Sequence, residues 1–218
     1  MRLDPHSYND TSQPETTHVY WKARVDFDAR EIEADAVLSF REAASGQLDL
    51  DTRDLRIDGV FDIDGQALAY VLHAEEPILG SRLSITLAAP TSGVRIHYRT
   101  SPEASALQWL TPAQTFGGRQ PFLFSQCQAV HARAVLPIQD TPRIRIKFRA
   151  ELDVPSNLKA LMAAAFVSRK ETDGRAVETF DMPQSIPPYL FALAVGELVA
   201  EELGPRSRVW AEPSVVKK

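Results

Sequence analysis

The sequence predicts a mostly β fold, and three observations support this prediction. Apolar residues alternate with polar ones in several short stretches between residues 19 and 150, which is the period of a half-buried strand. Turn-forming dipeptides such as Asp64-Gly65 separate some of these stretches. The 218 residues are 44% hydrophobic and 24% charged, a globular composition that can bury a sizeable core. Length alone allows one or two domains, but no linker or repeat divides the chain, so we expect one β-rich domain over residues 1–218.

The first two predicted strands form an antiparallel pair. From Val19 to Phe27 every second residue is apolar, and the intervening residues are polar or aromatic. The same alternation runs from Ile32 to Phe40. The polar stretch between them, which contains Asp28 and Arg30, suits a tight connection.

A meander continues this pattern to about residue 100. Asp64-Gly65 supplies the positive φ angles of a two-residue turn, which predicts a hairpin of residues 60–63 and 67–71. The apolar alternations of residues 83–87 and 94–98 flank Pro90-Thr91-Ser92-Gly93, where we expect another turn. The region from residue 19 to 100 is therefore predicted to be nearly all strand.

A further strand is predicted from Ile144 to Ala150. Its outer face is basic, with Arg143, Arg145, Lys147 and Arg149 alternating with the apolar residues. Such a stripe is usually a solvated face with acidic neighbours across the sheet, and we favour this interpretation over a nucleic-acid patch.

Two later segments are ambiguous. Asn157 to Phe166 is rich in Ala, Leu and Met and could form a short helix, limited by Pro155 and the 170–174 loop. The apolar run from Tyr189 to Gly196 follows two prolines, and its periodicity does not separate a buried strand from a buried helix.

Charge and hydropathy argue against nucleic acid and membranes as partners. The net charge of −5 opposes attraction to nucleic acid or anionic lipid. The most hydrophobic stretch, Tyr189 to Val199, has eleven residues and is too short to span a bilayer. Residues 1–20 lack the apolar core of a secretory signal, so we expect a cytoplasmic protein.

The residues of common catalytic sites are missing. Zinc peptidases use two histidines four residues apart on a helix with a glutamate beside the first. None of the five histidines, His6, His18, His73, His97 and His131, precedes a glutamate, and no two are four apart. The single Cys127 is expected to be a buried core residue, and on a strand it would lie about 13 Å from His131. We therefore expect no catalytic residue, metal ligand or cofactor in this chain.

Several ordered blocks resemble one family. They are residues 105–110 (Ser-Ala-Leu-Gln-Trp-Leu), 122–129 (Phe-Leu-Phe-Ser-Gln-Cys-Gln-Ala), 131–133 (His-Ala-Arg), 139–142, 186–190, 192–196 and 204–210. In order and spacing they resemble the N-terminal domain of leukotriene-hydrolase-type zinc aminopeptidases over most of the chain. Ile138 stands where leukotriene hydrolase has cysteine, which we interpret as a packing exchange.

This resemblance implies a fold, a partner and a site. The fold would be a saddle-like assembly of mixed and antiparallel β-sheets with few short helices, which favours a strand within residues 189–196. The partner would be the protein's own zinc-binding catalytic domain, which follows in that family and is absent from this chain. The site would be Gln126, Gln128 and Ala129, whose family counterparts line the pocket for a peptide substrate.

Two hypotheses about function follow. In the first, the chain is the pocket-forming front domain of a zinc aminopeptidase that removes N-terminal amino acids from peptides, and is inactive by itself. In the second, it is a stand-alone β-sheet module that binds a protein or peptide without cleavage. The sequence does not choose between an excised and a naturally truncated domain. It also leaves open the peptide selectivity, any epoxide hydrolysis by the parent protein and the oligomeric state.

Overall fold

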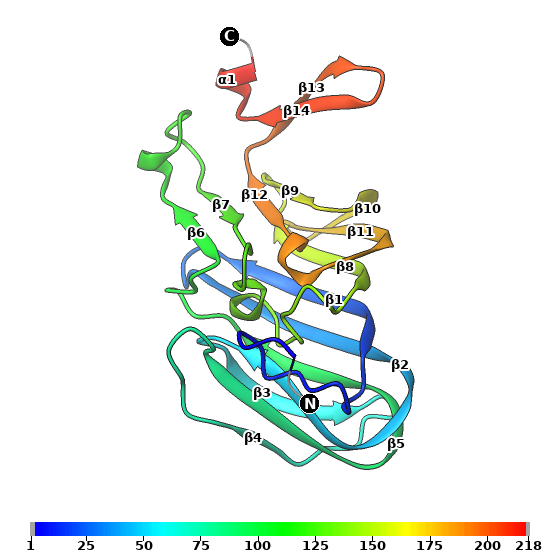
Figure 1. The fold of residues 1–218 in the computed structure, drawn as a ribbon. Helices are drawn as coiled ribbons and strands as arrows, with labels where there is room; N and C mark the ends of the chain where they lie inside the picture. Colours follow the sequence, from blue (N-terminus) through cyan, green and yellow to red (C-terminus); the bar gives the residue numbers. More distant parts are fainter. Residues whose placement is uncertain (1–2, 217–218) are drawn as a thin grey trace.

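The computed structural model describes residues 3–216 and contains one large mixed sheet with two smaller ones (Figure 1). The large sheet has the strand order β10-β11-β8-β1-β2-β5-β3, with β4 also paired to β5. Its strands are β1 (Thr16–Asp26), β2 (Glu31–Thr52), β3 (Arg56–Asp62), β4 (Tyr70–Leu72), β5 (Ser81–Arg99), β8 (Ile146–Pro155), β10 (Ala165–Thr172) and β11 (Arg175–Ile186). All neighbours are antiparallel except β1 and β8, which run parallel. The predicted mostly β class is confirmed.

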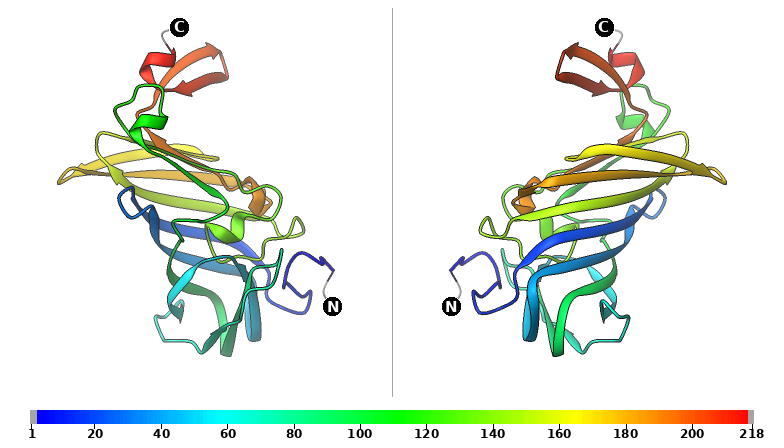
Figure 2. Two further views of the ribbon diagram at one scale, coloured as in Figure 1. Left: turned by 90° about the vertical axis from the view of Figure 1, so that its left-hand side faces the viewer. Right: turned by 90° about the vertical axis from the view of Figure 1, so that its right-hand side faces the viewer.

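The remaining strands form a second layer and a terminal hairpin. The four-stranded sheet contains β6 (Leu107–Leu110), β7 (Phe122–Ser125), β12 (Leu193–Gly196) and β9 (Lys159–Met162), in that order. The hairpin consists of β13 (Val199–Gly204) and β14 (Ser207–Ala211). The short helices are η1 (Pro112–Gln114), η2 (Ala132–Ala134), η3 (Pro188–Leu190) and α1 (Pro213–Val216). The N-terminal segment and this hairpin lie at opposite ends of the molecule (Figures 1 and 2).

The first predicted pair is confirmed in register. In β1 and β2, Val19 lies opposite Leu38 and Val25 opposite Ile32, all four fully buried. The alternation therefore places one face of each strand in the core and the other at the surface, as the period of two requires.

The turn predicted at residues 90–93 is wrong. Residues 81–99 form one long strand, β5, which pairs with β2 through an irregular stretch between Ser39 and Gly46. Pro90 lies in this stretch, where a residue without an N–H group is tolerated because ladder bonds are already interrupted. Gly93 fits because an added Cβ would lie 2.4 Å from the Leu38 carbonyl oxygen. The apparent turn signal is thus a bulge signal.

The predicted hairpin at Asp64-Gly65 is confirmed only at its turn. Gly65 has φ +86°, and Phe61 forms an isolated bridge with Ala67. After the turn, however, the chain returns to β5 further along that strand, where β4 pairs with residues 83–85 instead of extending the hairpin.

The predicted short helix within residues 157–166 is also wrong. Residues 159–162 form β9, paired to β12, and residue 165 begins β10 on the large sheet. Pairing with strands distant in sequence overrides the helical propensity of the alanines here. The ambiguous run of residues 189–196 divides between η3 and the strand β12.

A buried polar chain joins the core of the large sheet to the segment after β7. The Trp21 indole N–H donates to the Tyr98 hydroxyl at 2.7 Å, and that hydroxyl donates to the Val135 carbonyl at 2.9 Å. All three residues are buried, and Phe191 packs edge-on against Trp21. The segment of residues 126–141 is thereby held against the sheet, on the side where the N-terminal segment also lies (Figure 1).

Candidate functional site

Gln126, Gln128 and Ala129 lie in the turn that follows β7. They do not continue the strand, because β7 ends at Ser125 and residues 128–130 form a turn. The exposure pattern nevertheless alternates, since both glutamines and Ala129 are exposed while Cys127 is 1% exposed. We name residues 126–129 the glutamine turn. It presents two amides to solvent and anchors itself by the cysteine between them.

Both ends of the glutamine turn are hydrogen-bonded to the surrounding chain. The Gln126 N–H donates to the Ala106 carbonyl at 2.8 Å, which continues the β6–β7 pairing by one bond. The His131 N–H donates to the Cys127 carbonyl at 2.9 Å and closes the turn. Ser125, the last residue of β7, accepts the Leu193 N–H at 2.9 Å through its hydroxyl.

The two glutamine side chains differ in their local contacts. The Gln126 side-chain oxygen accepts a long bond, 3.4 Å, from the Gln128 N–H. The side chain of Gln128 has no hydrogen-bond partner within residues 3–216. An exposed primary amide can donate two hydrogen bonds and accept two without adding charge. The Gln128 amide is thus available to a ligand.

Cys127 and His131 do not form a nucleophilic pair. Burial, with a smaller contribution from the Asp140 carboxyl, raises the pKa of the Cys127 thiol to about 12, so the thiol is protonated at neutral pH. The His131 ring lies 2.9 Å from the Ser105 hydroxyl through Nδ1, and burial together with Arg53 and Arg133 lowers its pKa. Cys127 therefore acts as a buried anchor, as expected from the sequence.

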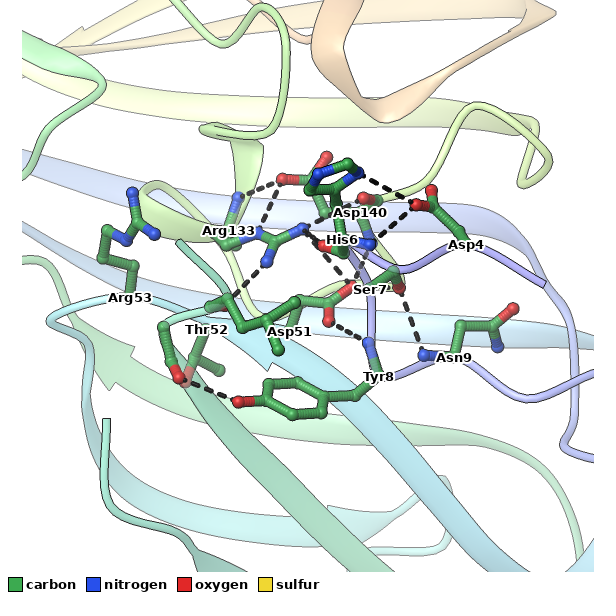
Figure 3. A network of polar contacts seen from close by, with 12 residues as sticks. Asp4, His6, Ser7, Tyr8, Asn9, Asp51, Thr52, Arg53, Arg133 and Asp140 are labelled. Carbon is green, nitrogen blue, oxygen red and sulfur yellow. Dashed lines mark hydrogen bonds and ion pairs between the residues drawn. The ribbon is translucent and has the colours of Figure 1, made fainter. Parts of the chain in front are cut away.

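A buried polar network surrounds Arg133, which follows the glutamine turn in the chain (Figure 3). Arg133 in η2 is 0% exposed, and its guanidinium donates to the Asp140 carboxylate at 3.1 Å and to the carbonyls of Leu79 at 2.6 Å and His6 at 2.7 Å. Asp51, also 0% exposed, lies 3.9 Å from the same guanidinium. In the sequence, Arg133 stands out only as part of a block that resembles the family. The available signal was a single charge inside the otherwise apolar run of residues 132–138.

The described residues do not fit a zinc site. No group of three or more His, Cys, Asp or Glu side chains within residues 3–216 is arranged to hold a metal ion. In the same part of the chain, none of the helices has the length and apolar character that a bilayer crossing requires.

Comparison with known proteins identifies the family. The peptidase M1 N-terminal domain matches residues 4–190. The chain belongs to this family. The M1 domain is 37% identical over 224 residues to a leukotriene A-4 hydrolase of Xenopus laevis, a match that covers 98% of this chain and 37% of the relative. It is 40% identical over 181 residues to leucine aminopeptidase 2 of Yarrowia lipolytica, covering 81% and 27%.

Solved structures agree with this assignment. The structure of a yeast LTA4 hydrolase in complex with bestatin superposes with a TM-score of 0.87 at 30% identity, over 99% of this chain and 34% of that one. The M1 domain thus spans about a third of the length of the relatives it matches. The expected family and its N-terminal domain are confirmed.

Proposed function

We propose that this chain forms part of the substrate pocket of a zinc aminopeptidase that removes N-terminal amino acids from peptides, and that it is inactive by itself. Membership of the M1 N-terminal domain family, whose relatives include a leucine aminopeptidase, is the observation that carries the proposal. Zinc would be held by a catalytic domain of the longer protein, because the described residues offer no ligand set. That domain would be the principal partner of this one.

The glutamine turn supplies the contact with substrate. Gln126 and Gln128 are exposed on a turn fixed at both ends, so their amides meet a ligand without first having to order the backbone. An amide can accept hydrogen bonds from a peptide amino terminus and donate to a peptide carbonyl. Ala129, exposed and small, leaves room for the substrate beside these amides.

The cheapest test is the reading frame after Lys218. A downstream His-Glu-x-x-His helix supports the aminopeptidase. A stop codon after Lys218 would contradict it and favour the stand-alone binding module. The extent of the domain over residues 1–218 and the cytoplasmic location stay predictions, and fractionation of cells that express the encoded protein would check the location.

The pocket role is tested by Gln128→Ala in the protein as its gene encodes it. Loss of one hydrogen bond to bound substrate should cost about 1 kcal/mol, or a several-fold to tenfold decrease in kcat/KM for peptides. Zinc content and melting temperature should stay nearly unchanged, because the Gln128 side chain makes no hydrogen bond within residues 3–216.

The matched control is Gln66→Ala, since Gln66 is also an exposed glutamine and lies beside the Asp64-Gly65 turn. It should retain full activity. If the double variant Gln126→Ala, Gln128→Ala kept the wild-type kcat/KM across several peptides, the pocket assignment would be wrong.

A further inference from the structure

Arg133 connects four parts of the chain that are far apart in sequence. Its guanidinium donates to the His6 carbonyl in the N-terminal segment, to the Leu79 carbonyl before β5, and to the carboxylate and carbonyl of Asp140. The Arg133 carbonyl accepts the Arg53 N–H at 2.9 Å, just after β2. Figure 3 shows these groups converging on one buried guanidinium.

The N-terminal segment is fastened to the same network through Asp51. The Asp51 carboxylate accepts the Ser7 hydroxyl at 2.6 Å, the Tyr8 N–H at 2.7 Å and the Asp140 N–H at 2.7 Å. Ser7 and Asp51 are 0% exposed. The Tyr8 hydroxyl also donates to the Gly80 carbonyl at 3.0 Å. We name residues 6–9 the N-terminal strap.

The glutamine turn leads directly into this anchor. Only Ala132, which is fully buried, separates Arg133 from His131, the residue whose N–H closes the turn. The Arg133 N–H itself donates to the Asp140 carboxylate at 3.2 Å, so both backbone and side chain of this residue are fixed. Within residues 3–216 the turn has no strand pairing beyond the bond of Gln126 to Ala106, so we infer that η2 and the end of β7 determine where its amides lie.

We propose that Arg133 is a positioning residue for the glutamine turn, and that the N-terminal strap holds Arg133 in place. The substrate part of this inference rests on the function proposed above, whereas the mechanical part does not. Arginine is required because its planar fork reaches four acceptor atoms, in three residues, at once. A lysine ammonium would keep the charge but is a single point on a flexible chain, so it would release some of these contacts.

The chain offers a matched control in Arg169. This arginine also donates to two backbone carbonyls, those of Ser156 at 2.6 Å and Leu158 at 3.0 Å, and pairs with the buried carboxylate of Glu178. None of these partners belongs to residues 126–141. Arg169→Lys therefore repeats the chemical change of Arg133→Lys away from the glutamine turn.

Hydrogen exchange tests the mechanical part in the protein as its gene encodes it. We expect Arg133→Lys to speed amide exchange in the peptide covering residues 126–132 by about tenfold or more, because local opening becomes easier there. Ser7→Ala, which removes only one strap contact, should act in the same peptide with a smaller effect. Arg169→Lys should leave that peptide unchanged.

Two exchange results would overturn the proposal. One is a wild-type exchange rate in residues 126–132 for both Arg133→Lys and Ser7→Ala. The other is a uniform increase over all peptides, which is the signature of a merely structural role. If Arg133→Lys does not fold, Ser7→Ala alone is the test: faster exchange confined to residues 126–132 supports the proposal, and either of the two results above overturns it.

Kinetics test the connection with substrate. Arg133→Lys should raise KM for peptides by about three- to tenfold with kcat within about twofold, because misplaced amides weaken binding in the ground and transition states alike. Faster exchange with an unchanged KM would refute the positioning role. The proposed function is refuted separately if Gln128→Ala keeps the wild-type kcat/KM while Arg133→Lys still speeds exchange in residues 126–132.

Discussion

Replacement of Tyr98 by phenylalanine removes one oxygen from the centre of the molecule. That oxygen accepts the Trp21 indole N–H and donates to the Val135 carbonyl, and all three residues are at most 1% exposed. The variant keeps the aromatic ring and its packing. It therefore isolates the two hydrogen bonds that connect β1, β5 and the segment after η2.

The loss of stability follows from the two buried polar groups that Tyr98→Phe leaves without a hydrogen bond. Tyr98→Phe strands a buried donor on Trp21 and a buried acceptor on Val135, and each unsatisfied group costs about 1–3 kcal/mol. We expect the free energy of unfolding to fall by about 2–6 kcal/mol. For a chain of this size, the melting temperature should fall by roughly 4–24 °C.

Urea unfolding measures the change, with Tyr70→Phe as the control because Tyr70 is 37% exposed. The control should lie within about 0.5 kcal/mol of the wild type. In a Trp21→Phe background the donor is already gone, so Tyr98→Phe should cost less than it does alone. An unfolding free energy of Tyr98→Phe equal to that of the control would refute the proposed coupling of sheet and segment.

Three further predictions concern Asp140, Gly80 and the binding of zinc. Burial, opposed by Arg133, raises the pKa of Asp140 to about 6, so the folded state binds more protons than the unfolded state between about pH 4 and 6. The free energy that Asp140 contributes to folding is therefore fully present below pH 4, and it should decrease by on the order of 3 kcal/mol as the pH rises through 6. Urea titrations of the wild type and of Asp140→Asn measure this change. A difference between their two unfolding free energies that does not change with pH would contradict it. Gly80→Ala should destabilise the fold by at least about 2 kcal/mol more than Gly65→Ala in the same assay, because both have positive φ but only at Gly80 would the new Cβ meet a carbonyl oxygen, 2.2 Å away. The isolated 218-residue chain should bind no stoichiometric zinc and release no amino acid from aminoacyl anilides; one tightly held zinc per chain by elemental analysis would be the opposing result.

Strand pattern could be predicted from sequence wherever one face of a strand is buried and the other is wet. The β1 and β2 alternations are read directly, because burial imposes a period of two. The prediction failed where the same residue types suit two different backbone structures. Pro90 to Gly93 marks an irregularity within β5, since the same residues that suit a turn also suit a strand that has lost its ladder bonds.

The alanine-rich segment failed for a different reason. Residues 159–162 have the composition of a helix, but their pairing with β12 gives them a place in the four-stranded sheet. Helix propensity is worth only tenths of a kcal/mol per residue, which tertiary pairing readily exceeds. Nothing within the segment itself identifies that distant partner.

The substrate-binding role of Gln126 and Gln128 stays a prediction, whereas the buried network around Arg133 could not be predicted from the sequence. The exposure of Gln126 and Gln128 and the burial of Cys127 agree with the expectation from sequence. This network was missed because its partners are remote: the residue numbers of His6 and Arg133 differ by 127, and those of Ser7 and Asp51 by 44. No local pattern carries information over such separations.

The lone charge within residues 132–138 still permits one deduction. A guanidinium among buried apolar neighbours must find carboxylates and carbonyls, since an unpaired buried charge costs several kcal/mol. The sequence thus implies a network around Arg133, with Asp140 as a partner within reach. Burial is the main reason that the pKa of Asp140 is raised, and the second carboxylate, Asp51, adds a smaller contribution in the same direction, because one arginine does not neutralise two negative charges. Asp51→Asn should therefore lower the pKa of Asp140 part of the way toward its usual range, which titration by NMR would detect; an unaltered Asp140 pKa in that variant would show that Asp51 does not contribute.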